Sequence, residues 1–125
     1  SMNWLMVALG GVSGALSRYA LIVLFEDVTR KTAFPWVILG VNVLGSLLAG
    51  LVFAIAHERQ WLTVSQQHLL SVGFLGAFTT YSAFSLDCVR LLQAGQWMMA
   101  GSYIVSTTLL CFAATAAGMV LARLI

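Results

Sequence analysis

Hydrophobic residues occupy four long runs of the chain, and short polar segments separate these runs. The runs cover approximately residues 4–25, 34–56, 66–92 and 97–122. Each is of the order of the ~20 residues that a helix needs to cross a bilayer, and none alternates with the period of a barrel strand. The pattern predicts an all-α membrane protein with four transmembrane helices in a single domain over residues 1–125.

The connections between the runs are short, at residues 26–33, 57–65 and 93–96, and we expect loops that join antiparallel neighbours. A tryptophan lies at or near an end of each run, as an aromatic belt at the membrane surface requires. These residues are Trp4, Trp36, Trp61 and Trp97.

Composition supports the membrane assignment, because 61% of the 125 residues are hydrophobic and only 8% are charged. Soluble domains carry about 25% charged residues. The net charge of +2, from scattered Lys and Arg, does not indicate a nucleic-acid partner. Neither histidine has a nucleophile or metal-ligand set around it, and Cys88 and Cys111 lack ligand spacing, so we expect no enzyme activity.

Positive charge is almost balanced between the two ends of the predicted bundle. Arg30, Lys31 and Arg90 lie on the side of the first and third connections, whereas Arg59 and Arg123 lie on the other side. Orientation in a membrane follows the Lys/Arg bias of the loops. Three against two either gives a weak orientation signal or allows insertion both ways round, which would make an antiparallel dimer possible.

A polar stripe interrupts the second run well inside the predicted membrane. Asn42 lies about 12 Å from the start of this helix at 1.5 Å per residue, and Ser46 and Gly50 follow on the same face. Such residues either glue two helices together or face a polar cavity. We keep both interpretations, pore lining and helix packing.

The third run contains the sequence GFLGAFTTYSAFS, from Gly73 to Ser85. Glycines and hydroxyl residues weaken a helix, so we predict a break near Gly76 to Thr80, at mid-membrane. Freed carbonyls at this depth must be buried or line a cavity, where they suit a monovalent cation. The alternative is a kinked helix that holds no ion.

Aromatic residues alternate with hydroxyls in this motif, and Tyr81, Ser82 and Phe84 are the clearest example. The edges of aromatic rings are electropositive, so they can hold a small anion without trapping it. Ordinary core packing is the competing interpretation.

The fourth run places four polar residues on one helical face, at a spacing of four. These are Tyr103, Thr107, Cys111 and Thr115, and they form either an ion track or a packing seam. Arg18 and Asp87 are the candidate vestibule residues. For Arg18 the alternative is an interfacial anchor, and for Asp87 a surface pair with Arg90.

Three of these elements form a recognisable set: Gly14-x-x-x-Arg18, Gly40-x-Asn42-x-x-Gly45 and Gly73-x-x-Gly76-x-x-Thr79-Thr80-Tyr81-Ser82-x-Phe84-Ser85. With four spans in 125 residues, the chain resembles the CrcB/Fluc family of fluoride channels. The resemblance covers essentially the whole chain. It implies a passive channel that exports fluoride across the inner membrane, built as a dual-topology antiparallel homodimer with two pores.

The resemblance also implies roles for individual residues. The backbone carbonyls of Gly76 and Thr79 from both subunits are expected to hold a structural Na⁺ at the centre of the dimer. Together with the patterns above, it gives a fluoride pathway lined by Asn42, Ser46, Tyr81, Ser82, Phe84, Tyr103, Thr107, Cys111 and Thr115. The chain departs from the family pattern at Tyr81, where Phe is usual, at Cys111, where a hydroxyl is usual, and at Asp87, where Glu is common.

Two other functions compete with a fluoride channel. A small multidrug antiporter also has about four spans, but such exporters resemble one another in an embedded carboxylate in the first span, and none precedes Glu26 here. A non-conducting membrane assembly subunit is the other. The residues themselves do not distinguish fluoride from chloride.

Overall fold

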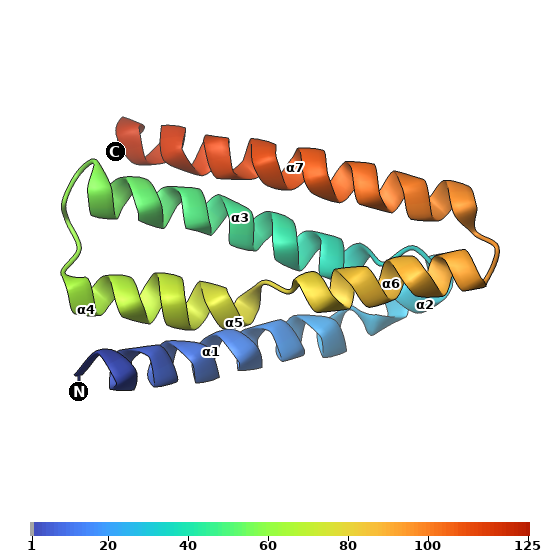
Figure 1. Cartoon of the computed structure of the whole chain (residues 1–125), viewed down its shortest axis with the longest axis horizontal. Coiled ribbons are helices and arrows are strands. Elements are labelled where there is room, and N and C mark those ends of the chain that lie inside the picture. The colour runs from blue at the N-terminus through green and yellow to red at the C-terminus, as the bar shows by residue number, and fades with distance from the viewer. Residues whose placement is uncertain (1) are drawn as a thin grey trace.

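The computed structural model describes residues 2–125. Four helical segments are long and apolar enough to cross a membrane: Met2–Leu24, Trp36–His57, Val64–Gln93 and Trp97–Leu124. Each end lies within two residues of the predicted end, so the prediction of four spans is confirmed. The elements are α1 (Met2–Leu24), α2 (Glu26–Thr32), α3 (Trp36–His57), α4 (Val64–Gln67), η1 (His68–Leu75), α5 (Gly76–Phe78), α6 (Tyr81–Gln93) and α7 (Trp97–Leu124) (Figure 1).

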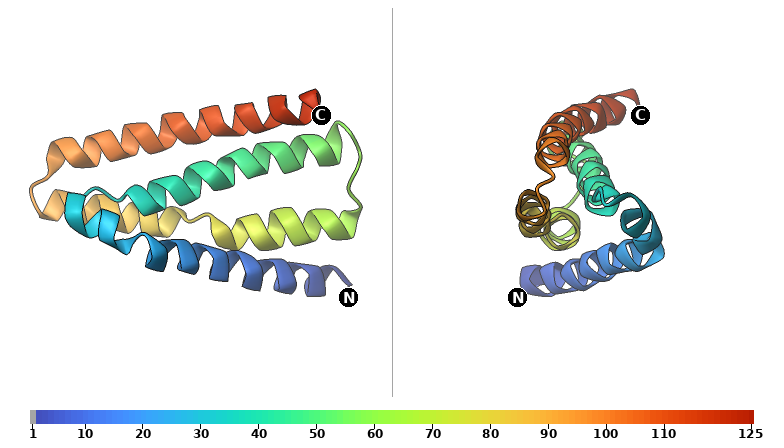
Figure 2. Two further views of the ribbon diagram at one scale, coloured as in Figure 1. Left: turned by 180° about the vertical axis from the view of Figure 1, so that it is seen from behind. Right: turned by 90° about the vertical axis from the view of Figure 1, so that its right-hand side faces the viewer.

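The long helices form two closely packed pairs (Figure 2). Helix α3 packs along α7, where Gly50 faces the carbonyl of Thr115 so closely that a Cβ would lie 2.0 Å from its oxygen. Helix α1 packs along the third span, where Gly14 meets the carbonyl of Phe74 in the same way. Small residues let helix backbones approach in membranes, where water supplies no driving force between helices.

The first connection corrects our expectation of a loop, because residues 26–32 form the two-turn helix α2. Acidic Glu26 and Asp27 occupy its first turn and basic Arg30 and Lys31 its last, which complements the helix dipole. Arg30 also pairs with Asp27. Ala33 ends the helix in the left-handed conformation (φ 62°).

The third span is not one regular helix. Thr63 and Gln66 form a reciprocal capping box that begins α4, and the chain continues through η1, a π-helix. Thr79 and Thr80 then leave helical geometry for extended conformations (φ −80°, ψ 154° and φ −151°, ψ 114°). The Thr80 hydroxyl accepts a hydrogen bond from the amide of Ala83 and so caps α6.

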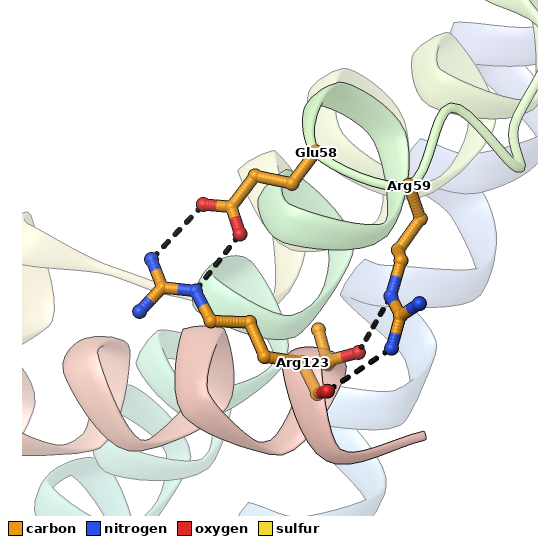
Figure 3. Close-up of polar contacts among 4 residues, drawn as sticks. Glu58, Arg59 and Arg123 are labelled. Atoms are coloured by element: carbon orange, nitrogen blue, oxygen red, sulfur yellow. Dashed lines mark hydrogen bonds and ion pairs between the residues drawn. The ribbon is translucent and has the colours of Figure 1, made fainter.

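The two ends of the bundle are closed differently. At the end that holds α2 and the α6–α7 turn, a buried cluster comprises Leu39, Phe84, Cys88, Leu91, Ala100 and Tyr103. At the other end, Arg123 forms a bidentate salt bridge with Glu58 (2.9 and 3.0 Å). Arg59 donates to the backbone carbonyls of Ala122 and Arg123 near the end of α7 (Figure 3). This clasp ties the α3–α4 connection to the C-terminal helix.

Candidate functional site

The break in the third span is held by a side chain from another helix. The Asn42 side-chain nitrogen donates to the Thr80 carbonyl (3.1 Å), and the Asn42 side-chain oxygen accepts from the Thr80 amide (2.9 Å). Asn42 and Thr80 are both buried. A buried backbone N–H or C=O without a hydrogen-bond partner costs about 1–3 kcal/mol. Asn42 bonds to both of these groups of Thr80 and so stabilises the extended conformation there.

This pairing changes the hydrogen bonding of Gly76. In an unbroken α-helix, the amide of Thr80 would donate to the carbonyl of Gly76, four residues earlier. That amide donates to Asn42 instead, so the Gly76 carbonyl loses its α-helical partner. The carbonyl of Thr79 accepts a hydrogen bond from the Arg18 guanidinium at 3.2 Å.

A cavity of about 660 Å³ lies between the break, α3 and α7. It gathers nine of the residues that the sequence singled out, from three separate segments. They are Asn42, Ser46, Gly76, Thr79, Tyr81, Phe84, Thr107, Cys111 and Thr115. Ser71, Thr80 and Thr108 add further hydroxyls to the lining, and no residue of the lining carries a charge.

Three of the four residues on the polar face of α7 line this cavity. Thr115 donates to the Ser46 carbonyl at 3.2 Å, so it also ties α7 to α3. The buried Thr107 hydroxyl has no hydrogen-bond partner within residues 2–125, and Cys111 is half-buried one turn further along. The Thr107 hydroxyl is therefore an unpaired polar group beside the cavity, with less than 1 Å² of accessible surface.

Three aromatic rings continue from the cavity towards the α2 end. Tyr81 meets Phe84 edge to face at 5.5 Å between centroids, and Phe84 meets Tyr103 in the same way at 5.0 Å. Phe84 is buried, whereas Tyr81 is 80% exposed although it lines the cavity. Edge-to-face packing directs a ring edge at a neighbouring ring face, and Phe84 belongs both to the buried cluster and to the cavity lining.

The remaining predicted site residues lie outside the cavity lining. The fully buried Tyr103 donates to an Asp87 carboxylate oxygen at 3.1 Å, and Ser82 lies 3.4 Å from the Thr80 hydroxyl. Asp87 forms no ion pair with Arg90 within residues 2–125. Arg18 contacts the centre of the third span through Thr79, so its guanidinium lies at the break rather than at a membrane-surface end of that span.

Sequence reasoning missed the backbone of Thr80 as the partner of Asn42, and the tight packing of Gly45. A Cβ at Gly45 would lie 2.3 Å from the Thr79 side-chain methyl, so glycine lets α3 approach the break. The sequence did contain a signal for this packing, because Gly45 follows Asn42 by three residues and both positions therefore lie on one face of the helix.

The donors at the break are backbone carbonyls rather than acidic or sulfur ligands. No group of three or more His, Cys, Asp or Glu that could hold a metal occurs in residues 2–125. Gly76 and Thr79 both line the cavity, and neutral carbonyl oxygens are suitable ligands for a hard monovalent cation. The two carbonyl oxygens fit such an ion chemically, although the Thr79 carbonyl oxygen already accepts a hydrogen bond from the Arg18 guanidinium.

A family model decides the membership of this chain. The model for "CrcB-like protein, Camphor Resistance (CrcB)" matches residues 5–119. The chain belongs to the CrcB-like family. Within that family it is 44% identical over 120 residues to a protein of Magnetococcus marinus, covering 95% of this chain and 96% of the other.

Two further relatives have similar coverage. A protein of Hahella chejuensis is 44% identical over 119 residues, which are 95% of this chain and 93% of its own. A protein of Saccharophagus degradans is 42% identical over 118 residues, which are 94% of this chain and 87% of its own. All three relatives bear the name "Fluoride-specific ion channel FluC".

Proposed function

We propose that this protein is a passive fluoride-selective channel. The observation that carries the proposal is the cavity, which is lined by amide, hydroxyl and ring-edge groups and by no charged residue. A conducting site must bind an ion well enough to admit it and weakly enough to release it. Neutral donors meet this condition for an anion, whereas a fixed positive charge would hold it.

The choice of fluoride rests on the relatives, which are named fluoride-specific ion channels. The cavity adds a physical argument, because fluoride is small and strongly hydrated and needs close donors in place of water. Thr107 lines the cavity, and rotation of its side chain would turn its unpaired hydroxyl towards the ion as such a donor. The second N–H of the Asn42 amide is another, since Thr80 uses only one of the two.

The competing functions have weaker support. A proton-coupled antiporter needs an exposed carboxylate at membrane depth, and the cavity lining contains none. An enzyme is disfavoured because the relatives are named ion channels. A non-conducting assembly subunit would not need a continuous polar face along α7.

The functional unit that we propose is an antiparallel homodimer with two pores. Tyr81 and Phe112 line the cavity yet are 80% and 74% exposed, so one copy leaves this face uncovered. A second, inverted copy on this face would close the cavity and repeat it by symmetry. The nearly even charge of the two ends, with Arg30, Lys31 and Arg90 against Arg59 and Arg123, is compatible with insertion in both orientations.

At the centre of this dimer we place a structural Na⁺, held by the carbonyls of Gly76 and Thr79 from both copies. The support is the missing α-helical partner of Gly76 and the shared cavity lining. Bound Na⁺ would join the two copies. Subunit counting on single molecules should find fewer dimers when a large organic cation replaces Na⁺, and an unchanged dimer fraction would argue against the ion.

A multi-pass membrane protein follows from the four apolar helices, and we place it in the inner membrane, where a passive channel lets fluoride leave the cell. Efflux from liposomes tests the function. Purified protein should release fluoride without a proton gradient and release chloride far more slowly. Equal release of both halides, or release only with a proton gradient, would contradict a passive fluoride channel.

A further inference from the structure

A second hollow of the bundle, a groove of about 280 Å³, runs between the end of α1, the short helix α2 and the first turns of α3. Every residue of its lining is aliphatic, aromatic or glycine. Helix α3 separates the groove from the cavity, because Gly40 and Leu44 of the groove fall on the opposite helical face from Asn42 and Ser46 of the cavity. The groove therefore lies outside the proposed ion path.

The depth of the groove suits one leaflet of a bilayer. Trp36 begins a membrane-spanning helix and lines the groove, and tryptophan is enriched at the membrane surface. From Trp36 to Leu44 the groove follows α3 for about 12 Å, at a rise of about 1.5 Å per residue. The hydrocarbon layer of one leaflet is about 15 Å thick, since the whole core measures ~30 Å. A fatty acyl chain that enters beside Trp36 can therefore lie along the groove.

Gly40 is a glycine that no neighbouring protein atom requires. A Cβ at Gly45 or Gly50 would lie 2.3 or 2.0 Å from an atom of another segment, whereas a Cβ at Gly40 would meet nothing within 4 Å. Glycine inside a helix is less favourable than alanine. Gly40 lines the groove, and its missing side chain leaves bare backbone against which an acyl chain can lie.

The surface end of the groove carries an unpaired positive charge. Lys31 follows Val28 of the lining by three residues, so the two side chains are neighbours on the surface of α2. The acidic residues of α2, Glu26 and Asp27, both pair with Arg30. Lys31 is exposed and forms no ion pair within residues 2–125, so its ammonium is available to a lipid phosphate.

We propose that this groove binds one anionic phospholipid, with an acyl chain along α3 and the phosphate paired to Lys31. A lipid matches the apolar lining, the depth of one leaflet, the bare backbone at Gly40 and the cation at the surface. In a zwitterionic lipid, the cation of the head group competes with Lys31 for the phosphate. The second copy proposed above belongs on the cavity face, on the other side of α3.

Native mass spectrometry of the purified full chain counts the lipids that stay bound. Phosphatidylglycerol and phosphatidylcholine with the same acyl chains are the probes, and each is titrated into the detergent solution. We expect phosphatidylglycerol to saturate at one molecule per chain. Its affinity should exceed that of phosphatidylcholine about fivefold, the effect of one Lys beside an anionic lipid. Adducts that increase without saturation, or equal affinities for the two lipids, would contradict the site.

Two pairs of variants locate the lipid. Gly40→Phe fills the groove, and Gly101→Phe is its control, because each glycine lies four residues after the tryptophan that begins its helix. A Cβ at either glycine meets nothing within 4 Å, and Gly101 does not line the groove. Lys31→Gln and Arg90→Gln each remove one exposed charge at the same end of the bundle, and only Lys31 lies on α2.

We expect Gly40→Phe to lose the saturable phosphatidylglycerol and Gly101→Phe to keep it. Lys31→Gln should lower the affinity for this lipid about fivefold, and Arg90→Gln should leave it unchanged. If Gly40→Phe fails to fold, Gly40→Leu and Gly101→Leu replace the first pair.

Wild-type lipid occupancy in Gly40→Phe would overturn the groove as the site. Equal losses in Lys31→Gln and Arg90→Gln would overturn the pairing with Lys31. A lower dimer fraction in Gly40→Phe with unchanged lipid binding would show that a second copy covers the groove. None of these measurements involves ion flow, so they test the lipid site even if the channel function fails.

Discussion

The side-chain amide of Asn42 pairs with both backbone groups of Thr80, at 2.9 and 3.1 Å. One side chain on α3 thereby replaces the helical hydrogen bond that the Thr80 amide would otherwise make to Gly76, and adds a bond to the Thr80 carbonyl. The same contact places Asn42 at the cavity wall. Asn42 can therefore both join two helices and line a pore. The bonds to Thr80 also fix the orientation of the second N–H of the Asn42 amide.

Replacing Asn42 should disrupt both fold and flux. Asn42→Ala leaves the buried Thr80 amide unpaired, at about 1–3 kcal/mol, or roughly a fivefold to hundredfold change in an equilibrium, and it also removes the bond to the Thr80 carbonyl. Asn42→Asp keeps the bond to the Thr80 amide but turns a carboxylate oxygen towards the Thr80 carbonyl. We expect a lower melting temperature in detergent and severely reduced fluoride efflux for both.

Ser13→Ala is the control for Asn42, since within residues 2–125 the Ser13 hydroxyl donates only to the Leu9 carbonyl of its own helix α1. It should change neither property measurably. Normal melting and efflux by Asn42→Ala would show that the pairing with Thr80 is dispensable.

The contact between Gly50 and Thr115 predicts a steric limit on the packing of α3 and α7. A Cβ at Gly50 would lie 2.0 Å from the Thr115 carbonyl oxygen, so Gly50→Ala must push the helices apart. Overpacking of this kind costs about 1–3 kcal/mol. We expect a lower melting temperature in detergent.

Gly40→Ala provides the comparison on the same helix, because a Cβ at Gly40 meets nothing within 4 Å. Alanine favours a helix over glycine by up to about 1 kcal/mol, so this variant should melt at the same temperature or higher. Equal melting of the two variants would contradict the close approach at Gly50.

The sequence predicted the four spans because about 20 apolar residues in a row leave few alternatives to a membrane helix. From the weak helix propensity of the motif it also predicted a break near Gly76 to Thr80, and the backbone leaves helical geometry at Thr79 and Thr80. Helix α2 was missed because charged residues suggested a loop, although their order suits a helix dipole. The Asn42–Thr80 pairing spans 38 positions and uses backbone atoms, so no local pattern could reveal it.

The aromatic contacts predict different outcomes for Phe84 and Tyr81. Phe84→Ile removes the ring that meets both Tyr81 and Tyr103, and each edge-to-face contact contributes about 0.5–1.5 kcal/mol beyond burial. Tyr81→Phe keeps its ring and loses only the hydroxyl. Liposome efflux should fall in Phe84→Ile and persist in Tyr81→Phe. An inactive Tyr81→Phe would make the hydroxyl essential and the ring-edge explanation incomplete.

The clasp between Glu58 and Arg123 predicts a small dependence of stability on pH. The hydrogen bond from Arg123 holds the pKa of Glu58 below its ordinary value of 4.5. A carboxyl whose pKa is lowered on folding stabilises the protein above its unfolded pKa, and this contribution is lost as pH falls through the folded value. The melting temperature should therefore decline below about pH 4.5, the ordinary value for Glu58.

Glu58→Gln should flatten part of this decline and melt close to the acidified wild type. Melting curves from pH 7 down to about pH 3, a range that brackets the ordinary Glu pKa, compare the two proteins. A wild type and a variant with parallel pH profiles would show that the clasp does not contribute.

The most direct test of a passive fluoride-selective channel is the reversal potential of the current through the purified protein in a planar bilayer. With a fluoride gradient across the bilayer, an opposite chloride gradient and no proton gradient, the neutral donor-lined cavity predicts a current that reverses near the equilibrium potential of fluoride. A reversal midway between the two halides, or no current at all, would contradict the account.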